Sequence, residues 1–209
     1  MRVGIFGGTF DPVHLGHLIL AEQCREQGRL DQVWFVPAPR PPHKRDEALT
    51  RFDQRVEMIH LAIAGQPAFR VDEIEKERSG PSYTVETVAE LRRRHPADDF
   101  ALLIGSDTLA EIHTWYEPAR LLSMVGLLVM NRPGYPTRTA EQIRAALRLP
   151  ESAPVRVEVL GSPLIDIASR DLRARAAAGR SLRYLVPRAI EVYIAERYLY
   201  RVAPPVERT

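Results

Sequence analysis

Short apolar runs alternate along this chain with longer stretches in which apolar residues recur every three or four positions. The short runs are typical of buried strands, and the longer spacing is typical of amphipathic helices. The pattern predicts strands at residues 2–6, 32–36, 69–72, 100–104, 126–130 and 155–159. It predicts helices at residues 15–27, 53–64, 85–94, 139–147, 169–177 and 187–198. This alternation favours an α/β fold, a Rossmann-like doubly wound parallel sheet with helices on both faces.

Local signals mark the ends of the first two predicted helices. Gly28 and Gly65 each stand where a helix would stop, as glycine commonly does just past a helix end. Thr50 and Asp53 have the spacing of a capping box before the second helix. Cys24, the single cysteine, falls inside the first helix, so we expect a buried, inert thiol.

The bulk composition is that of an ordinary folded protein. A length of 209 residues suits a single domain over 1–209, with a flexible tail at 202–209 that carries prolines and charges. Hydrophobic residues make up 45% and charged residues 27%, which argues against a disordered chain. The net charge of +2 gives little support to a nucleic-acid partner. The many arginines suit either a phosphate-rich ligand or solvated helix faces.

No apolar run approaches membrane-spanning length, and the first residues lead straight into glycines instead of forming a signal peptide. We therefore expect a cytoplasmic protein that contacts neither a membrane nor nucleic acid. The sequence leaves the oligomeric state open, and a homo-oligomer is compatible with it.

Chemically distinctive residues follow three of the predicted strands, at 2–6, 32–36 and 100–104. In a doubly wound sheet, ligands bind in the crevice beyond the carboxyl ends of the strands. The three segments that follow these strands should therefore lie together, which indicates one shared ligand site.

The segment after the first strand reads GGTFDPVHLGHL over residues 7–18. Its paired glycines let backbone amides approach an anion closely, and the N-terminus of the next helix adds unsatisfied N–H groups. The glycine spacing differs from the dinucleotide fingerprint, and no Gly-Lys-Ser/Thr follows. The segment therefore predicts an anion site that is neither of these two kinds.

His14 and His17 stand three residues apart at the start of this helix and share one face. Gly16, between them, removes a side chain and permits a phosphate to approach. Two imidazoles around one phosphate would stabilise the charge that develops on a pentacoordinate phosphorus. Capping histidines and a metal site are alternatives, but no Glu follows His14 as in zinc proteases and no third ligand is evident. Phosphate binding is the favoured interpretation.

The segment 7–17 resembles the signature of the nucleotidyltransferase superfamily with the His-x-Gly-His motif. Within that superfamily the chain is most similar to the bacterial nicotinate-nucleotide adenylyltransferases, in order over nearly its whole length. The resemblance implies transfer of the adenylyl group of ATP to nicotinate mononucleotide, giving nicotinate adenine dinucleotide and pyrophosphate in NAD biosynthesis. Mg²⁺ is the cofactor that it implies, bound with ATP as substrate.

The resemblance also implies roles for individual residues. His17, assisted by His14, would stabilise the α-phosphate of ATP, and Lys44 would follow the departing pyrophosphate. The ATP-binding residues that it implies are Gly7, Gly8, Thr9, Phe10, His14, Gly16, His17, Gly105, Asp107, Ser169 and Arg173. Those for nicotinate mononucleotide are Tyr83, Thr84, Trp115, Tyr116 and Arg132. We expect no dedicated protein metal site.

Several of these positions have a second interpretation. Lys44 follows the proline-rich stretch 37–42, which we expect to be an active loop or lid, but a surface lysine in a charged loop fits as well. Thr84 suits a helix cap as well as a ligand contact. Asp107 suits three roles: accepting a hydrogen bond from a ligand hydroxyl, holding a magnesium-bound water, or capping the N-terminus of the next helical turn. Trp115 suits a position in the core, or a stacking contact with the pyridinium ring, which a cation–π interaction would stabilise by roughly 0.5–2 kcal/mol.

The motif at 167–173 departs from the family pattern. Ala168 stands where the first serine is usual, and Arg170 stands where a threonine is usual. Ser169 and Arg173 remain, and with a helix N-terminus they still form a plausible triphosphate clamp. The departure weakens the interpretation that two hydroxyls bind the β- and γ-phosphates. Arg170 either compensates through its charge or points away.

Other functions remain open from the sequence. The same chemistry with nicotinamide mononucleotide, phosphopantetheine or a cytidylyl group is the nearest alternative. A fragment of a class I aminoacyl-tRNA synthetase needs an anticodon-binding module and a lysine-rich signature, yet Lys44 and Lys76 are the only lysines. A nucleotide-binding sensor without turnover is disfavoured by the intact histidine pair.

Overall fold

A computed structural model describes residues 1–41, 48–78, 80–132, 134–161, 163 and 165–201. Its centre is a six-stranded sheet in the order β3-β2-β1-β4-β5-β6, with every neighbouring pair parallel. The strands are β1 (Arg2–Gly8), β2 (Gln32–Pro37), β3 (Phe69–Val71), β4 (Asp99–Gly105), β5 (Gly126–Met130) and β6 (Val157–Leu160). This order is that of a doubly wound sheet, and it confirms the predicted fold class.

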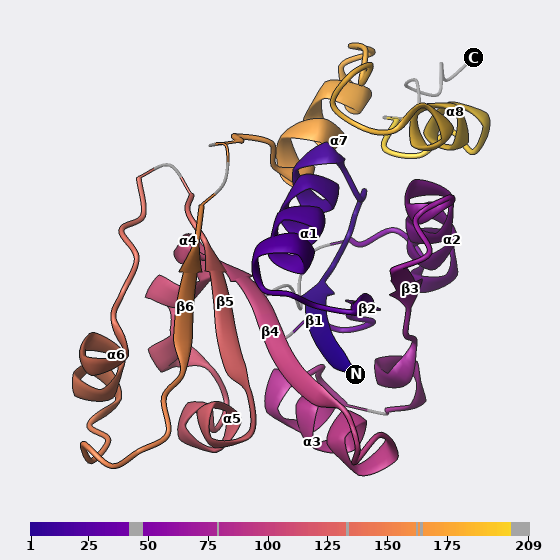
Figure 1. The fold of residues 1–209 in the computed structure, drawn as a ribbon. Helices are drawn as coiled ribbons and strands as arrows, with labels where there is room; N and C mark the ends of the chain where they lie inside the picture. Colours follow the sequence, from indigo (N-terminus) through magenta and orange to yellow (C-terminus); the bar gives the residue numbers. More distant parts are fainter. Residues whose placement is uncertain (42–47, 79, 133, 162, 164, 202–209) are drawn as a thin grey trace, which may run out of the picture.

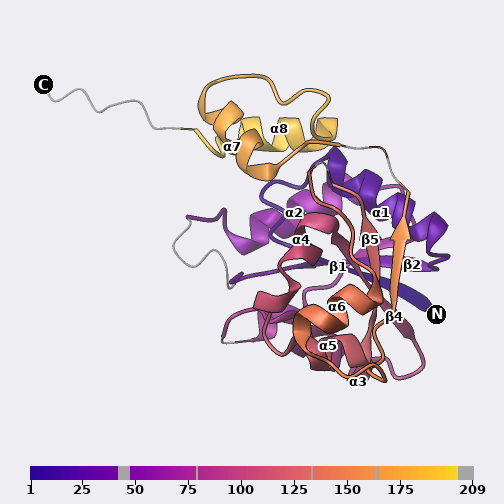
Figure 2. The same ribbon diagram turned by 90° about the vertical axis from the view of Figure 1, so that its left-hand side faces the viewer.

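Helices cover both faces of the sheet (Figure 1). They are α1 (Leu15–Gln27), α2 (Phe52–Ile63), α3 (Thr84–Arg94), α4 (Ser106–Ala110), α5 (Pro118–Met124), α6 (Ala140–Leu147), α7 (Ser169–Ala177) and α8 (Arg188–Glu196), with 3₁₀ turns η2 (Ile74–Glu77) and η3 (Ile112–Thr114). Helices α7 and α8 lie at one end of the molecule, α7 next to the start of α1 and α8 next to α2 (Figures 1 and 2).

The side chains of each strand alternate between two hydrophobic clusters, because successive residues of a strand point to opposite faces. In β2, Phe35 belongs to the cluster that includes buried residues of α1, α2 and α8, whereas Trp34 belongs to the cluster that includes buried residues of α3 and α5. Cys24 is buried in the first cluster, as expected, and burial raises the pKa of its thiol to about 12. Within the part of the chain that the structure describes, every helix is too short or too polar to cross a membrane.

The predicted elements agree closely with the observed ones. The bounds of α1, β5 and α7 match the prediction, and the remaining predicted strands and helices end within two residues of it. Gly28 caps the end of α1, and Gly65 follows α2 with a φ of +90°, a conformation that glycine adopts without strain. The short helices α4 and α5 were not predicted, because helices of five or seven residues show little periodicity.

The capping box expected at Thr50 and Asp53 is wrong. Helix α2 begins at Phe52 after Arg51, and no side chain caps it. The Asp53 carboxylate pairs with Arg51 at 2.7 Å instead. The backbone N–H of Thr50 donates to the carboxylate of Asp11, so tertiary contacts outweigh the local signal here.

Candidate active site

The carboxyl end of β1 lies at the centre of the sheet, where the strand order reverses. Gly7 and Gly8 end this strand, and among the described residues no atom lies within 4 Å of where a Gly7 side chain would begin. A Cβ on Gly8 would meet the ring of Phe10 at 2.9 Å. Phe10 is buried, with a φ of +50°, and its ring packs closely against Gly8.

His14 and His17 cap the N-terminus of α1 reciprocally. The Nδ1 atom of His14 accepts from the backbone N–H of His17 at 3.3 Å, and Nδ1 of His17 accepts from the N–H of His14 at 3.2 Å. Their rings stack with centroids 3.6 Å apart. A neutral imidazole that accepts at Nδ1 carries its proton on Nε2. Capping therefore leaves both Nε2–H groups as donors for a ligand.

The two imidazoles are held in their neutral form. Burial, with the nearby Arg132 cation, lowers the pKa of His14 to about 3. Burial, His14 and Arg132 also lower the pKa of His17 well below its usual range. Two desolvated donors beside a guanidinium form a site that favours an anion.

Arg132 follows β5 and lies near the histidine pair. Its backbone N–H donates to the hydroxyl of Ser106 at 2.9 Å, and its guanidinium donates to the carbonyl of Ile165 at 3.1 Å. Its Nε atom is 3.6 Å from the carboxylate of Asp107. A Cβ on Gly105 would stand 2.2 Å from that carboxylate, so a larger residue here would displace the Asp107 side chain. Gly105, and not Asp107, occupies the N-cap position of α4.

The N-terminus of α7 is tied to the loop between β1 and α1. The hydroxyl of Ser169 donates to the carbonyl of Pro12, and Arg173 donates to the carbonyl of Asp11, each at 2.9 Å. The side chain of Arg170 is 84% exposed and lies 3.6 Å from Asp171. Ser169 and Arg173 thus reach the loop between β1 and α1, and Arg170 points away from it.

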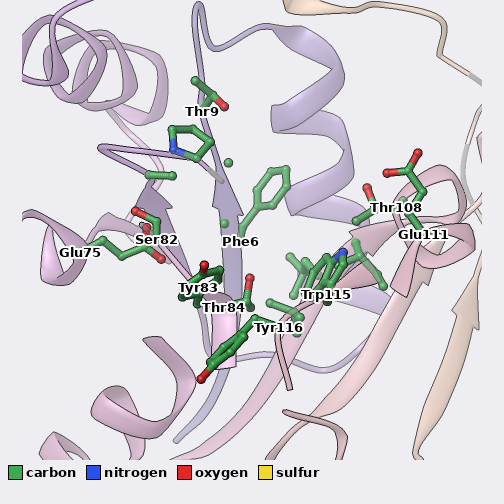
Figure 3. Close-up of a pocket in the computed structure, with 18 of the residues that line it drawn as sticks. Phe6, Thr9, Glu75, Ser82, Tyr83, Thr84, Thr108, Glu111, Trp115 and Tyr116 are labelled. Carbon is green, nitrogen blue, oxygen red and sulfur yellow. The ribbon is translucent and has the colours of Figure 1, made fainter. Parts of the chain in front are cut away.

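A cavity of about 670 Å³ opens beside this loop (Figure 3). Gly7, Gly8, Thr9 and Gly105 line one part of it, and the aromatic side chains line another. The rings of Tyr83 and Tyr116 lie 4.5 Å apart. Trp115 and Thr84 lie beside them, so four of the five residues predicted for nicotinate mononucleotide are brought together. The fifth, Arg132, lies with the histidines, and the cavity lining does not include it.

Thr84 does not cap α3, so of its two interpretations the helix cap is wrong. It is the first residue of the helix, and Tyr83 before it makes no side-chain cap. Without a capping bond, the Thr84 side chain is part of the cavity wall.

Sequence reasoning missed several residues of the cavity. Glu75 and Ser82 lie on one side of it, and Thr108 and Glu111 lie on the other (Figure 3). Glu75 is only 6% exposed, burial raises the pKa of its carboxyl, and its Oε1 accepts from the hydroxyl of Thr87 at 2.6 Å. Glu75 belongs to a charged stretch with Glu73, Lys76 and Glu77, and such a stretch gives no local signal that one carboxyl is buried. Lys44, also predicted, lies outside the described residues, as does the tail 202–209.

The chain is similar to known proteins both in its sequence and in its fold. The family model described as Cytidylyltransferase-like matches residues 5–175. The chain is 45% identical to a Thermus thermophilus protein named "probable nicotinate-nucleotide adenylyltransferase", over 96% of this chain and 100% of that protein. A Salinibacter ruber protein of the same name is 42% identical, over 96% of this chain and 98% of that protein.

Among solved structures, the fold is similar to that of the Plasmodium falciparum nicotinic acid mononucleotide adenylyltransferase. In its complex with NaAD the TM-score is 0.78, with 19% identity over 95% of this chain and 97% of that one. In its complex with APC the TM-score is 0.77, with 95% and 96% covered. At this identity the likeness supports the fold alone.

Proposed function

The chain belongs to the cytidylyltransferase-like family and, within it, to the nicotinate-nucleotide adenylyltransferases, and we propose that the site described above transfers the adenylyl group of ATP to nicotinate mononucleotide. An oxygen of the mononucleotide phosphate attacks the α-phosphorus of ATP. The bond between that phosphorus and the bridging oxygen breaks, and pyrophosphate leaves with the electron pair. The product, nicotinate adenine dinucleotide, is a precursor of NAD.

The reciprocal capping of His14 and His17 is the observation that carries this proposal. The nucleophile is already an anion, so the reaction needs positioning and charge neutralisation more than a base. The two Nε2–H donors, fixed by hydrogen bonds at Nδ1, are suited to the oxygens of the α-phosphate. His17 is proposed as the main donor, with His14 assisting.

ATP is proposed to lie along the phosphate loop, from the β1 glycines to the N-terminus of α7. Backbone amides of Gly7, Gly8 and Thr9 and the start of α1 offer N–H groups to phosphate oxygens. Phe10 and Gly16 give the loop its shape, since a Cβ on Gly16 would stand 3.1 Å from the His14 ring.

The outer phosphates require further contacts. Ser169 and Arg173 lie in the first half of α7, where their side chains hold the loop between β1 and α1, and they are proposed to face the same anion site. Arg132, beside the histidines, would pair with a phosphate of either substrate. Lys44 is proposed to neutralise the departing pyrophosphate, as a mobile point charge.

The acceptor is proposed to bind in the aromatic part of the cavity. The pyridinium ring of nicotinate mononucleotide carries a positive charge, which the faces of Trp115, Tyr83 and Tyr116 attract. The nicotinate carboxylate needs hydrogen-bond donors, and the hydroxyl of Thr84 with nearby backbone amides is proposed to supply them. The amide group of nicotinamide mononucleotide would need a hydrogen-bond acceptor as well.

Mg²⁺ is proposed to arrive with ATP, because it keeps water ligands and binds phosphates with one or two carboxylates. Asp107 fits this role, since its side chain is 36% exposed at the edge of the sheet where the phosphates would lie. The ion would supply neutralisation of the phosphate charge.

The test is a product analysis. The protein is incubated with ATP, Mg²⁺ and one of three acceptors, namely nicotinate mononucleotide, nicotinamide mononucleotide or phosphopantetheine. A parallel set of reactions contains CTP in place of ATP as the donor. Products are identified by mass and pyrophosphate is quantified. A dinucleotide from nicotinate mononucleotide with equimolar pyrophosphate is expected, and its absence would refute the proposal.

A further inference from the structure

Asp11, in the loop between β1 and α1, is 1% exposed. One oxygen of its carboxylate accepts from the hydroxyl of Tyr200 at 2.6 Å, and the other accepts from the backbone N–H of Thr50 at 3.1 Å. Its backbone carbonyl accepts from Arg173. A buried carboxylate needs such partners, so these bonds fix the loop at this point.

Arg55 makes a second attachment to the same loop. Its buried guanidinium donates to the carbonyls of Thr9 at 2.7 Å, Ala38 at 2.9 Å and Thr50 at 3.0 Å. Hydrogen bonds with a charged donor are among the stronger ones in proteins. Together with Asp11, this residue connects the phosphate loop to the chain after β2, to the start of α2 and to the C-terminal segment.

Tyr200 lies just beyond the end of α8, at the far end of the sequence from Asp11. Its φ is +64°, which is uncommon for a residue with a bulky side chain. The ring packs against the hydrophobic cluster of α1, α2 and α8. Burial and the carboxylate of Asp11 raise the pKa of the phenol, so the hydroxyl remains a donor at neutral pH.

We propose that Tyr200 is a positioning residue for adenylyl transfer, acting through Asp11 on the loop that presents His14 and His17. The inference rests on the proposed function. Tyr200 does not line the cavity. Asp11 is three positions before His14, so a shift of its carboxylate moves the N-cap of α1. The C-terminal segment thereby contributes to catalysis without touching substrate.

Tyr200→Phe removes the hydroxyl and keeps the ring, and Tyr198→Phe is the matched control because Tyr198 is 70% exposed. We expect kcat of Tyr200→Phe to fall about tenfold, as for loss of a hydrogen bond to a charged group, with the KM for nicotinate mononucleotide unchanged. Tyr198→Phe should match the wild type. Urea denaturation establishes that each variant is folded under assay conditions.

A double-mutant cycle with Asp11→Asn separates positioning from general destabilisation. If Tyr200 acts through Asp11, Tyr200→Phe should lower kcat less than twofold in the Asp11→Asn background, because coupled residues are not additive. The inference would be overturned if the two substitutions lowered kcat by independent factors that multiply. An unchanged kcat for folded Tyr200→Phe, or a change in that variant confined to a higher KM for nicotinate mononucleotide, would overturn it as well. A wild-type protein without transfer activity would instead refute the proposed function.

Discussion

His14 and His17 each use Nδ1 to accept the backbone N–H of the other, and their rings stack 3.6 Å apart. The same arrangement is a helix cap and a pair of aligned donors. The two sequence-based alternatives, capping and phosphate binding, are therefore compatible, because capping fixes which nitrogen carries the proton.

The first prediction concerns the main donor. His17→Ala should lower kcat by roughly 10²–10³, because an oxyanion-type donor is lost. The exposed His60 on α2 provides the control, and His60→Ala should keep wild-type kcat. Steady-state kinetics on variants shown to be folded measure both. Near-normal turnover by His17→Ala would remove His17 from the mechanism.

The second prediction concerns pH and stability. His14 has a folded-state pKa of about 3, below its usual value near 6.5, so between these limits the unfolded chain binds the extra proton. The stabilisation is complete above pH 6.5 and is lost as the pH falls, by up to about 1.4 kcal/mol per unit. His17 contributes in the same direction.

Urea denaturation at a series of pH values measures this effect. His14→Asn keeps a good N-cap acceptor but does not titrate. Its free energy of unfolding should fall less steeply than that of the wild type between pH 6.5 and 4.5. Parallel curves for the two proteins would contradict the lowered pKa of His14.

Local sequence signals predicted much of the fold, and they failed where tertiary contacts decide. The periodicity of residues 85–94 and 187–198 predicts α3 and α8, because apolar residues at helical spacing form one buried face of each helix. Thr50 has the spacing of a capping residue, yet its N–H is bonded to Asp11, which no local pattern reveals.

The same distinction applies to the site. The glycines and histidines at residues 7–17 lie close together in sequence, so their chemistry can be predicted from the chain. Arg132 and Glu75 are placed by strand order and by contacts with distant residues. Periodicity carries no information about the neighbours of such residues, so the position of Arg132 beside the histidines was not foreseen.

The third prediction concerns the β1 glycines. In Gly7→Ala the new methyl group would meet no atom of the described residues within 4 Å, so stability should change by less than about 1 kcal/mol. The methyl group would occupy the cavity at the proposed phosphate path and should lower kcat/KM for both substrates. Gly80→Ala, also free of contacts and outside the cavity lining, is the control. Unchanged kcat/KM in Gly7→Ala would place the phosphates elsewhere.

The fourth prediction concerns the acceptor. Tyr116 is 49% exposed, so Tyr116→Ala should fold normally while losing the ring that faces Tyr83. The KM for nicotinate mononucleotide should rise about 3- to 30-fold, as loss of a cation–π contact implies, with the KM for ATP unchanged. The exposed Tyr184, outside the cavity lining, gives the control Tyr184→Ala. A rise in the ATP KM alone would assign the aromatic group to adenine.

The measurement that tests the central claim most directly is a competition between acceptors. Nicotinate mononucleotide and nicotinamide mononucleotide are supplied at equal concentration with limiting ATP and Mg²⁺, and the two dinucleotides are quantified by mass. The acid product is predicted to dominate by at least about tenfold, since the aromatic end of the cavity is proposed to offer donors to a carboxylate. Equal amounts of the two products, or an excess of the amide product, would contradict nicotinate as the preferred acceptor.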